Sequence, residues 1–214
     1  MKFKWWGHSC FLLTLDNGRE ILTDPYDNSL PYQQMTDKPD IVTSSHDHFD
    51  HNAVKRVPGK FKVVDDVEGY KDDIVSINGI HTYHDHSEGK ERGDNIIFLI
   101  NSGDITITHM GDTGHLPSQQ KLQKLKETNI LLIPVGGYYT IDADEAYEIA
   151  EAVNPDVIIP MHFKTDILDF PITGVENFIA KYDSDMVERV GDAEVEFDQF
   201  PPDKKVYVLN YVGQ

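Results

Sequence analysis

Three histidines and two aspartates occur within six residues of one segment of this sequence. They are His46, Asp47, His48, Asp50 and His51. The apolar, β-branched run 41–43 before them predicts a strand, so residues of metal-binding type follow a strand end. Two imidazoles separated by one residue can share an ion, whereas Asp50 and His51 would direct an oxygen and a nitrogen elsewhere. A lone histidine is more often a surface or hydrogen-bonded residue, but this combination favours two neighbouring metal sites.

Further residues of the same types follow other predicted strands along the chain. Bulky or β-branched runs predict strands at 3–6, 10–15, 20–23, 61–64, 73–77, 80–83, 95–100, 105–108, 130–135 and 157–160, with closing strands at 195–197 and 205–210. Near their ends lie His8, Asp24, His84, His86, His109, Asp112, His115 and His162. Helices are expected at 52–57, 118–127, 142–153 and 175–181. Antiparallel strands first, then strands alternating with helices, indicate one two-layered domain spanning residues 1–214.

The spacing His-x-His-x-Asp-His at 46–51 resembles the signature of the metallo-β-lactamase superfamily, and the resemblance extends from Gly7-His8 to Met161-His162-Phe163. It implies an α+β fold, the four-layer αββα sandwich. Within the superfamily the chain is similar to a small bacterial branch that includes ascorbate-6-phosphate lactonase-like proteins and other metal-dependent hydrolases. The segments that carry this similarity are 23–25, 84–85, 93–95, 111–115, 134–140 and 160–163.

The resemblance also implies a set of metal ligands. For the first metal, His46 and His48 match the paired histidines, and His84 is the expected third ligand. Strand alternation would put His84 and His86 on the same side, so spacing alone does not separate them. For the second metal, the matching residues are Asp50, His51 and His162, and Asp112 after Gly111 matches the bridging aspartate. Two divalent ions are expected, with Zn²⁺ favoured and Mn²⁺, Ni²⁺ or Fe as alternatives.

Several other residues have two interpretations each. His8 and Asp24 could fix the tautomer of a ligand imidazole, although Asp24 before Pro25 could equally be a turn residue. His109 and His115 flank Asp112 and could face the site. Tyr138, Tyr139 and Lys164 are expected near its rim, and the loop 26–40 could cover it. Gly136 and Gly137 are expected to give the backbone room beside the metals.

Charge and composition limit the class of partner. Nineteen basic and 37 acidic residues give a formal net charge of −18, and no basic cluster offsets it, which counts against nucleic acid. No apolar run is long enough to span a bilayer, and the N-terminal residues lack a signal-peptide pattern, so we expect a cytoplasmic protein. The single cysteine, Cys10, lies in an apolar run and is expected to be buried and inert. The sequence does not determine the oligomeric state, and a homo-oligomer is one alternative.

The expected function is that of a binuclear metal-dependent hydrolase. In the family that the chain resembles, two cations bridge a water and supply a hydroxide, and the aspartate matching Asp50 acts as the catalytic residue that orients it. The expected substrate is a small lactone, ester, amide or phosphodiester. The alternatives are a non-catalytic metal-binding or ligand-sensing protein on the same fold, an RNA-processing nuclease, or an iron enzyme with redox chemistry.

Overall fold

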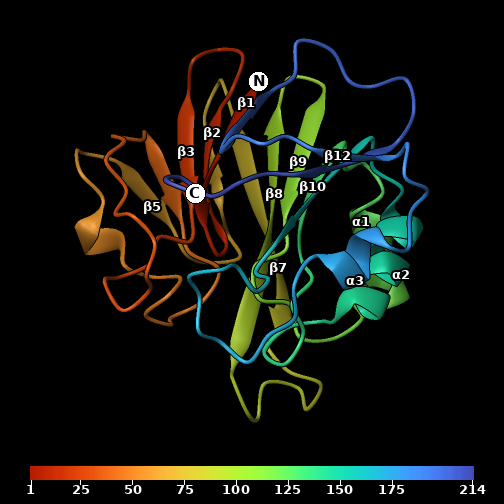
Figure 1. Ribbon diagram of the computed structural model, residues 1–214. Coiled ribbons are helices and arrows are strands. Elements are labelled where there is room, and N and C mark those ends of the chain that lie inside the picture. The colour runs from red at the N-terminus through yellow and green to blue at the C-terminus, as the bar shows by residue number, and fades with distance from the viewer.

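Two β-sheets form the framework of the computed structural model, which describes all residues 1–214 (Figure 1). The first sheet has the strand order β13-β1-β2-β3-β4-β5. Its strands are β1 (Lys2–Gly7), β2 (Cys10–Thr14), β3 (Glu20–Thr23), β4 (Ile41–Thr43), β5 (Lys62–Val64) and β13 (Glu194–Glu196). The β3–β4 and β4–β5 pairs are parallel, and the other pairs are antiparallel.

The second sheet has the order β12-β14-β11-β10-β9-β8-β7-β6. Its strands are β6 (Tyr70–Lys71), β7 (Ser76–Tyr83), β8 (Asp94–Ser102), β9 (Ile105–His109), β10 (Ile130–Pro134), β11 (Val157–Met161), β12 (Val187–Arg189) and β14 (Lys205–Val208). The strands from β9 to β12 pair in parallel, and β6 to β9 pair antiparallel. Every residue of β10 and β11 is buried, as expected for continuous apolar strands inside a parallel sheet.

The helices lie mainly on one side of the molecule, beside the second sheet (Figure 1). They are α1 (Gln119–Lys124), α2 (Ala143–Val153) and α3 (Glu176–Ile179). A capping box begins α2, because the Asp142 side chain accepts from the backbone N–H of Glu145 and the Glu145 side chain accepts from that of Asp142. The α+β class with two packed sheets is therefore confirmed.

Some element boundaries differ from the prediction. The segment 52–57 forms only a three-residue 3-10 helix, η1 (Val54–Arg56), which has no buried residue and no side-chain cap to extend it. The run predicted at 73–77 is a strand only from Ser76, and Gly79 continues the extended backbone into the run at 80–83, so that both runs form one strand, β7. The short strands β6 and β12 were not predicted, since their pairing partners rather than their own residues hold them.

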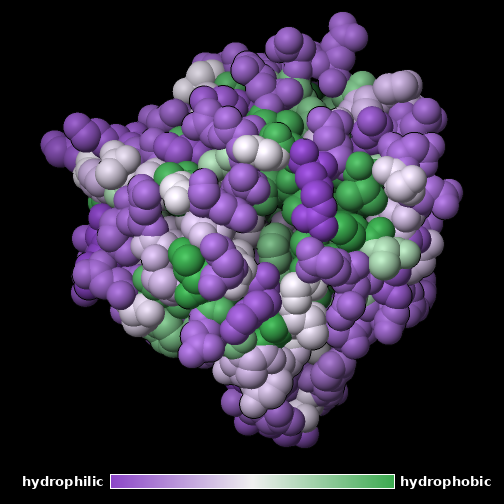
Figure 2. Space-filling view, viewed as in Figure 1, coloured by the Kyte–Doolittle hydropathy of each residue, from purple (hydrophilic) through white to green (hydrophobic).

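The core and surface are sharply divided. A single cluster of 54 buried hydrophobic residues packs the interior, and Cys10 lies within it. Hydrophilic residues cover most of the face drawn in Figure 2, in keeping with the net charge of −18. None of the helices is both long and apolar enough to cross a membrane.

The parallel strand pairs determine where the polar residues gather. The carboxyl ends of neighbouring parallel strands lie at the same edge of a sheet. In the first sheet, β3 and β4 lead into Asp24 and the 44–51 segment. In the second sheet, β9, β10 and β11 lead into residues 110–115, 135–140 and 162. Segments distant in sequence therefore deliver their ligand-type residues to one region.

Candidate metal centre

The first group of metal-ligand residues joins His46, His48 and His84, whose potential ligand atoms all lie within 4.8 Å of one another. His46 and His48 belong to the segment after β4, and His84 directly follows β7. The Ser45 hydroxyl lies 3.0 Å from His46 Nδ1, while His46 Nε2 has no hydrogen-bond partner. This histidine is therefore held at one nitrogen and free at the other.

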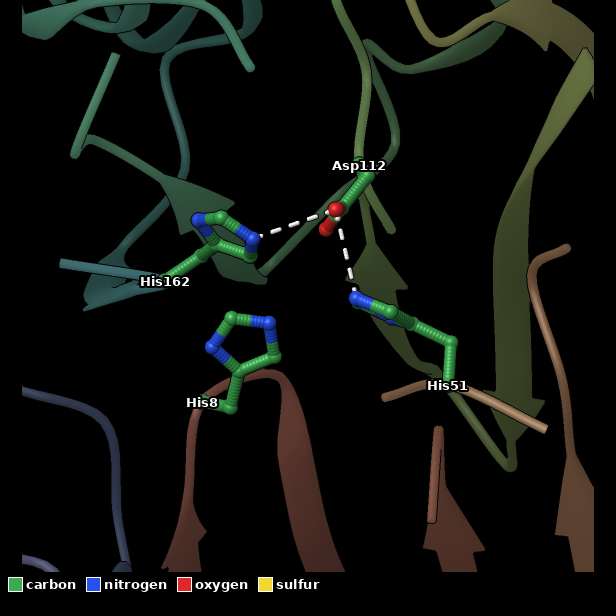
Figure 3. A group of neighbouring side chains, drawn as sticks. All are labelled: His8, His51, Asp112 and His162. Carbon is green, nitrogen blue, oxygen red and sulfur yellow. Dashed lines mark ion pairs between the residues drawn. The ribbon is translucent and has the colours of Figure 1, made fainter. Parts of the chain in front are cut away.

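The second group joins His8, His51, Asp112 and His162 within the same 4.8 Å limit, and all four are buried. Figure 3 shows that they come from separate parts of the chain, with His8 on the turn between β1 and β2 and His162 just past β11. Their side chains converge on one point although 154 positions separate His8 from His162 in the sequence. Only the folded chain can assemble this group.

Asp112 lies between the two groups. Its Oδ2 atom is 3.2 Å from His51 Nε2, 3.1 Å from His162 Nε2 and 3.2 Å from His84 Nε2. His84 belongs to the first group and the other two histidines to the second. One carboxylate oxygen therefore contacts both groups, which is the position that a bridging ligand would take.

Asp24 supports the centre from behind. Its Oδ2 atom is 2.8 Å from His51 Nδ1 and accepts a hydrogen bond of 2.6 Å from the Ser45 hydroxyl, and the residue is fully buried. Of the two interpretations of Asp24, the tautomer-fixing one fits this geometry, because a carboxylate at Nδ1 leaves Nε2 to face the cluster. The burial of Asp24 alone would raise its pKa, but His109, His51 and the hydrogen bonds lower it.

Asp50 lies at the edge of the second group. Its Oδ2 atom is 3.3 Å from His8 Nε2 and 3.9 Å from His51 Nε2. The four residues whose potential ligand atoms lie within 4.8 Å of one another include His8 but not Asp50. The sequence pointed to His8 only as a supporting residue, and the signal for it was its position in Gly7-His8 at a strand end.

Burial and mutual charge set the protonation of the cluster. Burial and the neighbouring His162 lower the pKa of His8 to about 4, while burial and His51 lower that of His46 to about 2. Burial would also lower the pKa of His51, but Asp112 and Asp50 raise it well above its usual value. Burial alone would raise the pKa of Asp112, but its electrostatic and hydrogen-bond interactions with His162 and His51 hold that pKa well below its usual range. The carboxylates of Asp112 and Asp50 therefore favour a positive charge at His51.

The donor set fits divalent metal ions. Both ring nitrogens of His8 and the Nε2 atoms of His46 and His51 are buried without a hydrogen-bond partner. In His84 and His162 the unpaired buried nitrogen is Nδ1, while Nε2 faces Asp112. Leaving a buried polar atom unpaired costs about 1–3 kcal/mol, so such a concentration points to a function. Imidazoles with free lone pairs beside a carboxylate are the ligands of Zn²⁺ and related metals.

Strained backbone accompanies these residues. His8, Asp24 and His162 have φ values of 54°, 39° and 48°, a region that non-glycine residues seldom occupy. Such strain persists where the surrounding structure imposes it, often at functional sites. Gly136 gives the room expected of it, because a Cβ there would lie 2.2 Å from the His162 carbonyl oxygen.

Other histidines lie outside the centre. His86 is exposed, with Nε2 3.7 Å from Glu145 Oε1, so the structure separates it from the buried His84. The alternation argument does not apply, because β7 ends at Tyr83 and both histidines lie in the turn that follows. His109 Nε2 is 2.9 Å from the Ser9 carbonyl oxygen, and His115 Nε2 is 2.9 Å from the Thr82 hydroxyl. His109 therefore contacts the turn that carries His8, and His115 contacts strand β7.

A cavity of about 350 Å³ opens onto the centre. Its lining residues are His48, Phe49, Asp50, His84, Arg92, Asp112, Tyr139, His162 and Phe170. Of the residues expected at the rim, Tyr139 lines the cavity, while Tyr138 and Lys164 do not. Lys164 donates instead to the Phe170 carbonyl oxygen at 2.8 Å.

The expectation that residues 26–40 cover the site is wrong for this cavity, since none of them lines it. Apolar residues anchor this loop on the core instead, including the buried Tyr26, Leu30, Tyr32 and Met35. The Tyr26 hydroxyl lies within hydrogen-bond distance of the backbone carbonyl oxygens of Trp6 and Gln33, at 2.8 and 2.6 Å.

Comparison with known proteins gives a consistent set of similarities. A family model described as the β-lactamase superfamily domain matches residues 2–162. A crystal structure of a candidate zinc-dependent hydrolase of the metallo-β-lactamase superfamily from Thermotoga maritima is 38% identical, covers 97% of each chain and has a TM-score of 0.82.

Metal-dependent hydrolases of the UPF0173 group are also similar in sequence. One from Caldivirga maquilingensis is 31% identical over 191 residues, covering 76% of this chain and 82% of the relative. Another, from Thermoplasma acidophilum, is 28% identical over 191 residues and covers 77% and 84%.

Proposed function

The chain belongs to the metallo-β-lactamase superfamily, and from this premise we propose that it is a binuclear metal-dependent hydrolase of small organic molecules. The observation that carries the proposal is the position of Asp112 Oδ2, 3.1–3.2 Å from histidines of both ligand groups. A single carboxylate oxygen that reaches both ligand groups favours a pair of adjacent cations over one isolated ion.

The proposed ligands are the residues that the family resemblance implies, and all of them except Asp50 belong to the two groups. His46, His48 and His84 would hold the first ion, and Asp50, His51 and His162 the second, with Asp112 between them. Zn²⁺ suits this mixture of imidazole and carboxylate best, while Mn²⁺, Ni²⁺ and Fe are compatible with it. When bound, the ions would polarise the bond to be cleaved and lower the pKa of a water placed for attack.

The protein side chains would supply positioning and proton transfer. Asp50 lines the cavity, and its carboxylate can accept a proton from an attacking water at Oδ2. His8 Nε2, 3.3 Å from that oxygen, would hold the carboxylate in place. Asp24 would fix the ring of His51.

The cavity limits the substrate to a small molecule. A volume of about 350 Å³ is at the lower end of the range for small-molecule sites. Phe49, Tyr139 and Phe170 provide apolar surface for the organic part of a substrate. Lactones, esters, amides and phosphodiesters of this size fit the proposal.

A substrate panel on metal-reconstituted protein tests the proposed function. The protein would be loaded with zinc, manganese or nickel and assayed on lactones, esters, amides and phosphodiesters. We expect His48→Ala to reduce kcat/KM by more than about 100-fold and to lower the bound metal, because it removes a direct ligand. His86→Ala is the matched control, since this exposed histidine lies outside the centre, and its activity should stay within about twofold of the original.

Two results would contradict the proposal. One is complete inactivity across the panel at two bound metal ions per chain, which would favour a non-catalytic metal-binding or ligand-sensing protein. The other is hydrolysis that His48→Ala leaves unchanged.

A further inference from the structure

We propose that Arg92 forms a binding site for an anionic group, a carboxylate or a phosphate, on the substrate. This inference rests on the proposed hydrolase function and names the class of its substrate. Arg92 is the only lysine or arginine that lines the 350 Å³ cavity at the metal centre. It also lines a neighbouring cavity of about 610 Å³, and His48 is shared by the two cavities.

The guanidinium group of Arg92 is available for a ligand. Its side chain is about 30% exposed, and its nearest carboxylate is that of Glu91, at 3.7 Å, on the same exposed turn. The guanidinium makes no hydrogen bond to a protein acceptor and lies 5.6 Å from the centre of the Tyr139 ring. Lys164, the other cation expected near the rim, is already occupied by the Phe170 carbonyl oxygen and Asp169. Arg92 therefore keeps the paired N–H donors that bind carboxylates and phosphates in a bidentate manner.

The turn that carries Arg92 is built to hold it in place. The buried Asp85 carboxylate accepts backbone N–H groups of Ser87, Gly89, Glu91 and Arg92 at 2.7–3.0 Å. Asp85 directly follows the ligand residue His84. One aspartate therefore connects the proposed metal ligand to the cation, and their spacing is set by backbone hydrogen bonds rather than by a flexible loop.

The net negative charge of the protein indicates why a basic residue lines this cavity. A chain with a net charge of −18 repels small anions over most of its surface. A basic residue in the cavity wall is useful there if the substrate itself is negatively charged. Tyr139 and Phe170 lie 5.8 Å apart between ring centres and offer apolar surface in the same cavity. The expected substrate is thus a small organic acid or phosphate monoester whose cleavable bond lies close to its anionic group.

Ligand binding tests this inference without relying on turnover. Calorimetry on the zinc-treated protein would compare benzoate and phenyl phosphate with the neutral benzamide. We expect at least one anion to bind more tightly than benzamide, and Arg92→Gln to weaken that anion about 10-fold or more while leaving bound zinc and benzamide affinity unchanged. Arg92→Lys should restore part of the affinity, because the charge remains but the paired donors do not. Arg189→Gln, on the distant strand β12, is the matched control.

Benzoate and phenyl phosphate show whether Arg92 prefers a carboxylate or a phosphate on the substrate. The anion whose affinity falls more on Arg92→Gln is the better model of the substrate. Equal binding of all three compounds to the original protein, or anion affinities unchanged by Arg92→Gln, would overturn the inference.

A pair of esters separates this inference from the proposed function. The mono-4-nitrophenyl ester of succinic acid carries a carboxylate, and 4-nitrophenyl butyrate is its neutral counterpart. We expect Arg92→Gln to lower kcat/KM about 10-fold or more for the charged ester alone. If the original protein cleaves neither ester, the hydrolase proposal loses support, while the binding comparison still decides the role of Arg92.

Discussion

At the residue scale, His8 is the residue whose role the structure changes most. The sequence placed it at a strand end, but only the folded chain brings it within 3.3 Å of Asp50 and into a buried group with His51 and His162. The segment 46–51 could be recognised in advance because its ligand types are consecutive. His8 could be named only as a supporting residue, because the partners that place it in the second group are far away in the sequence.

His8→Asn tests whether His8 positions Asp50. Asparagine tolerates the left-handed backbone at this position, so the substitution removes the imidazole without adding strain. We expect kcat to fall about 10–100-fold while metal analysis still gives two ions per chain. Loss of one ion from His8→Asn would instead make His8 a metal ligand and contradict the positioning role. His81→Ala, on the exposed face of β7, is the control.

At the scale of elements, the connection between β7 and β8 carries both the proposed metal ligand His84 and the proposed anion-binding residue Arg92. In Figure 1 this yellow-green segment projects at the bottom of the molecule. Sequence pattern predicted the strands on either side but not the arrangement between them. The choice between His84 and His86 depended on where β7 ends, and strand ends are set by pairing with β8 rather than by residue type.

Asp85→Ala should loosen this connection. Four backbone N–H groups would lose their acceptor. A single hydrogen bond to a charged group contributes about 1.5–3 kcal/mol, so we expect the loss of these four to lower the free energy of unfolding by at least about 2 kcal/mol. Hydrogen exchange at residues 87–92 should become faster, and zinc affinity should fall because His84 is adjacent.

Asp142→Ala provides the matched control for that experiment. It removes the N-cap of α2 and should cost about 1 kcal/mol. Exchange at residues 87–92 and zinc affinity should not change. If both variants alter zinc affinity equally, Asp85 has no specific role in the site.

At the scale of the whole molecule, the centre joins the two sheets. His8, His46, His48, Asp50 and His51 follow strands of the first sheet, whereas His84, Asp112 and His162 follow strands of the second. The class of fold could be predicted from the order of strands and helices. The convergence of the two sheets on Asp112 could be expected only from the family resemblance, because no local pattern encodes a contact across the core.

Metal removal should therefore destabilise the entire fold. A ligand present at about 100 times its Kd contributes about 2.7 kcal/mol of stability, and 1 kcal/mol corresponds to roughly 2–4 °C in Tm for a chain of this size. We expect EDTA to lower the Tm of the zinc-loaded protein by roughly 5–10 °C for each site emptied. EDTA presaturated with zinc is the control and should leave Tm unchanged. An identical Tm with and without metal would show that the ions do not bind the two sheets together.

The strands that follow His162 determine when in folding the metal site can be completed. All the proposed ligands precede them, yet β13 pairs with β1 in the first sheet and β14 pairs with β11 in the second. When His162 of a nascent chain has just left the ribosome, every proposed ligand residue has been synthesised. At that point β1 and β11 would each still lack one neighbouring strand. Metal uptake into a fixed site would therefore belong to the last stage of folding, after these strands have closed both sheets.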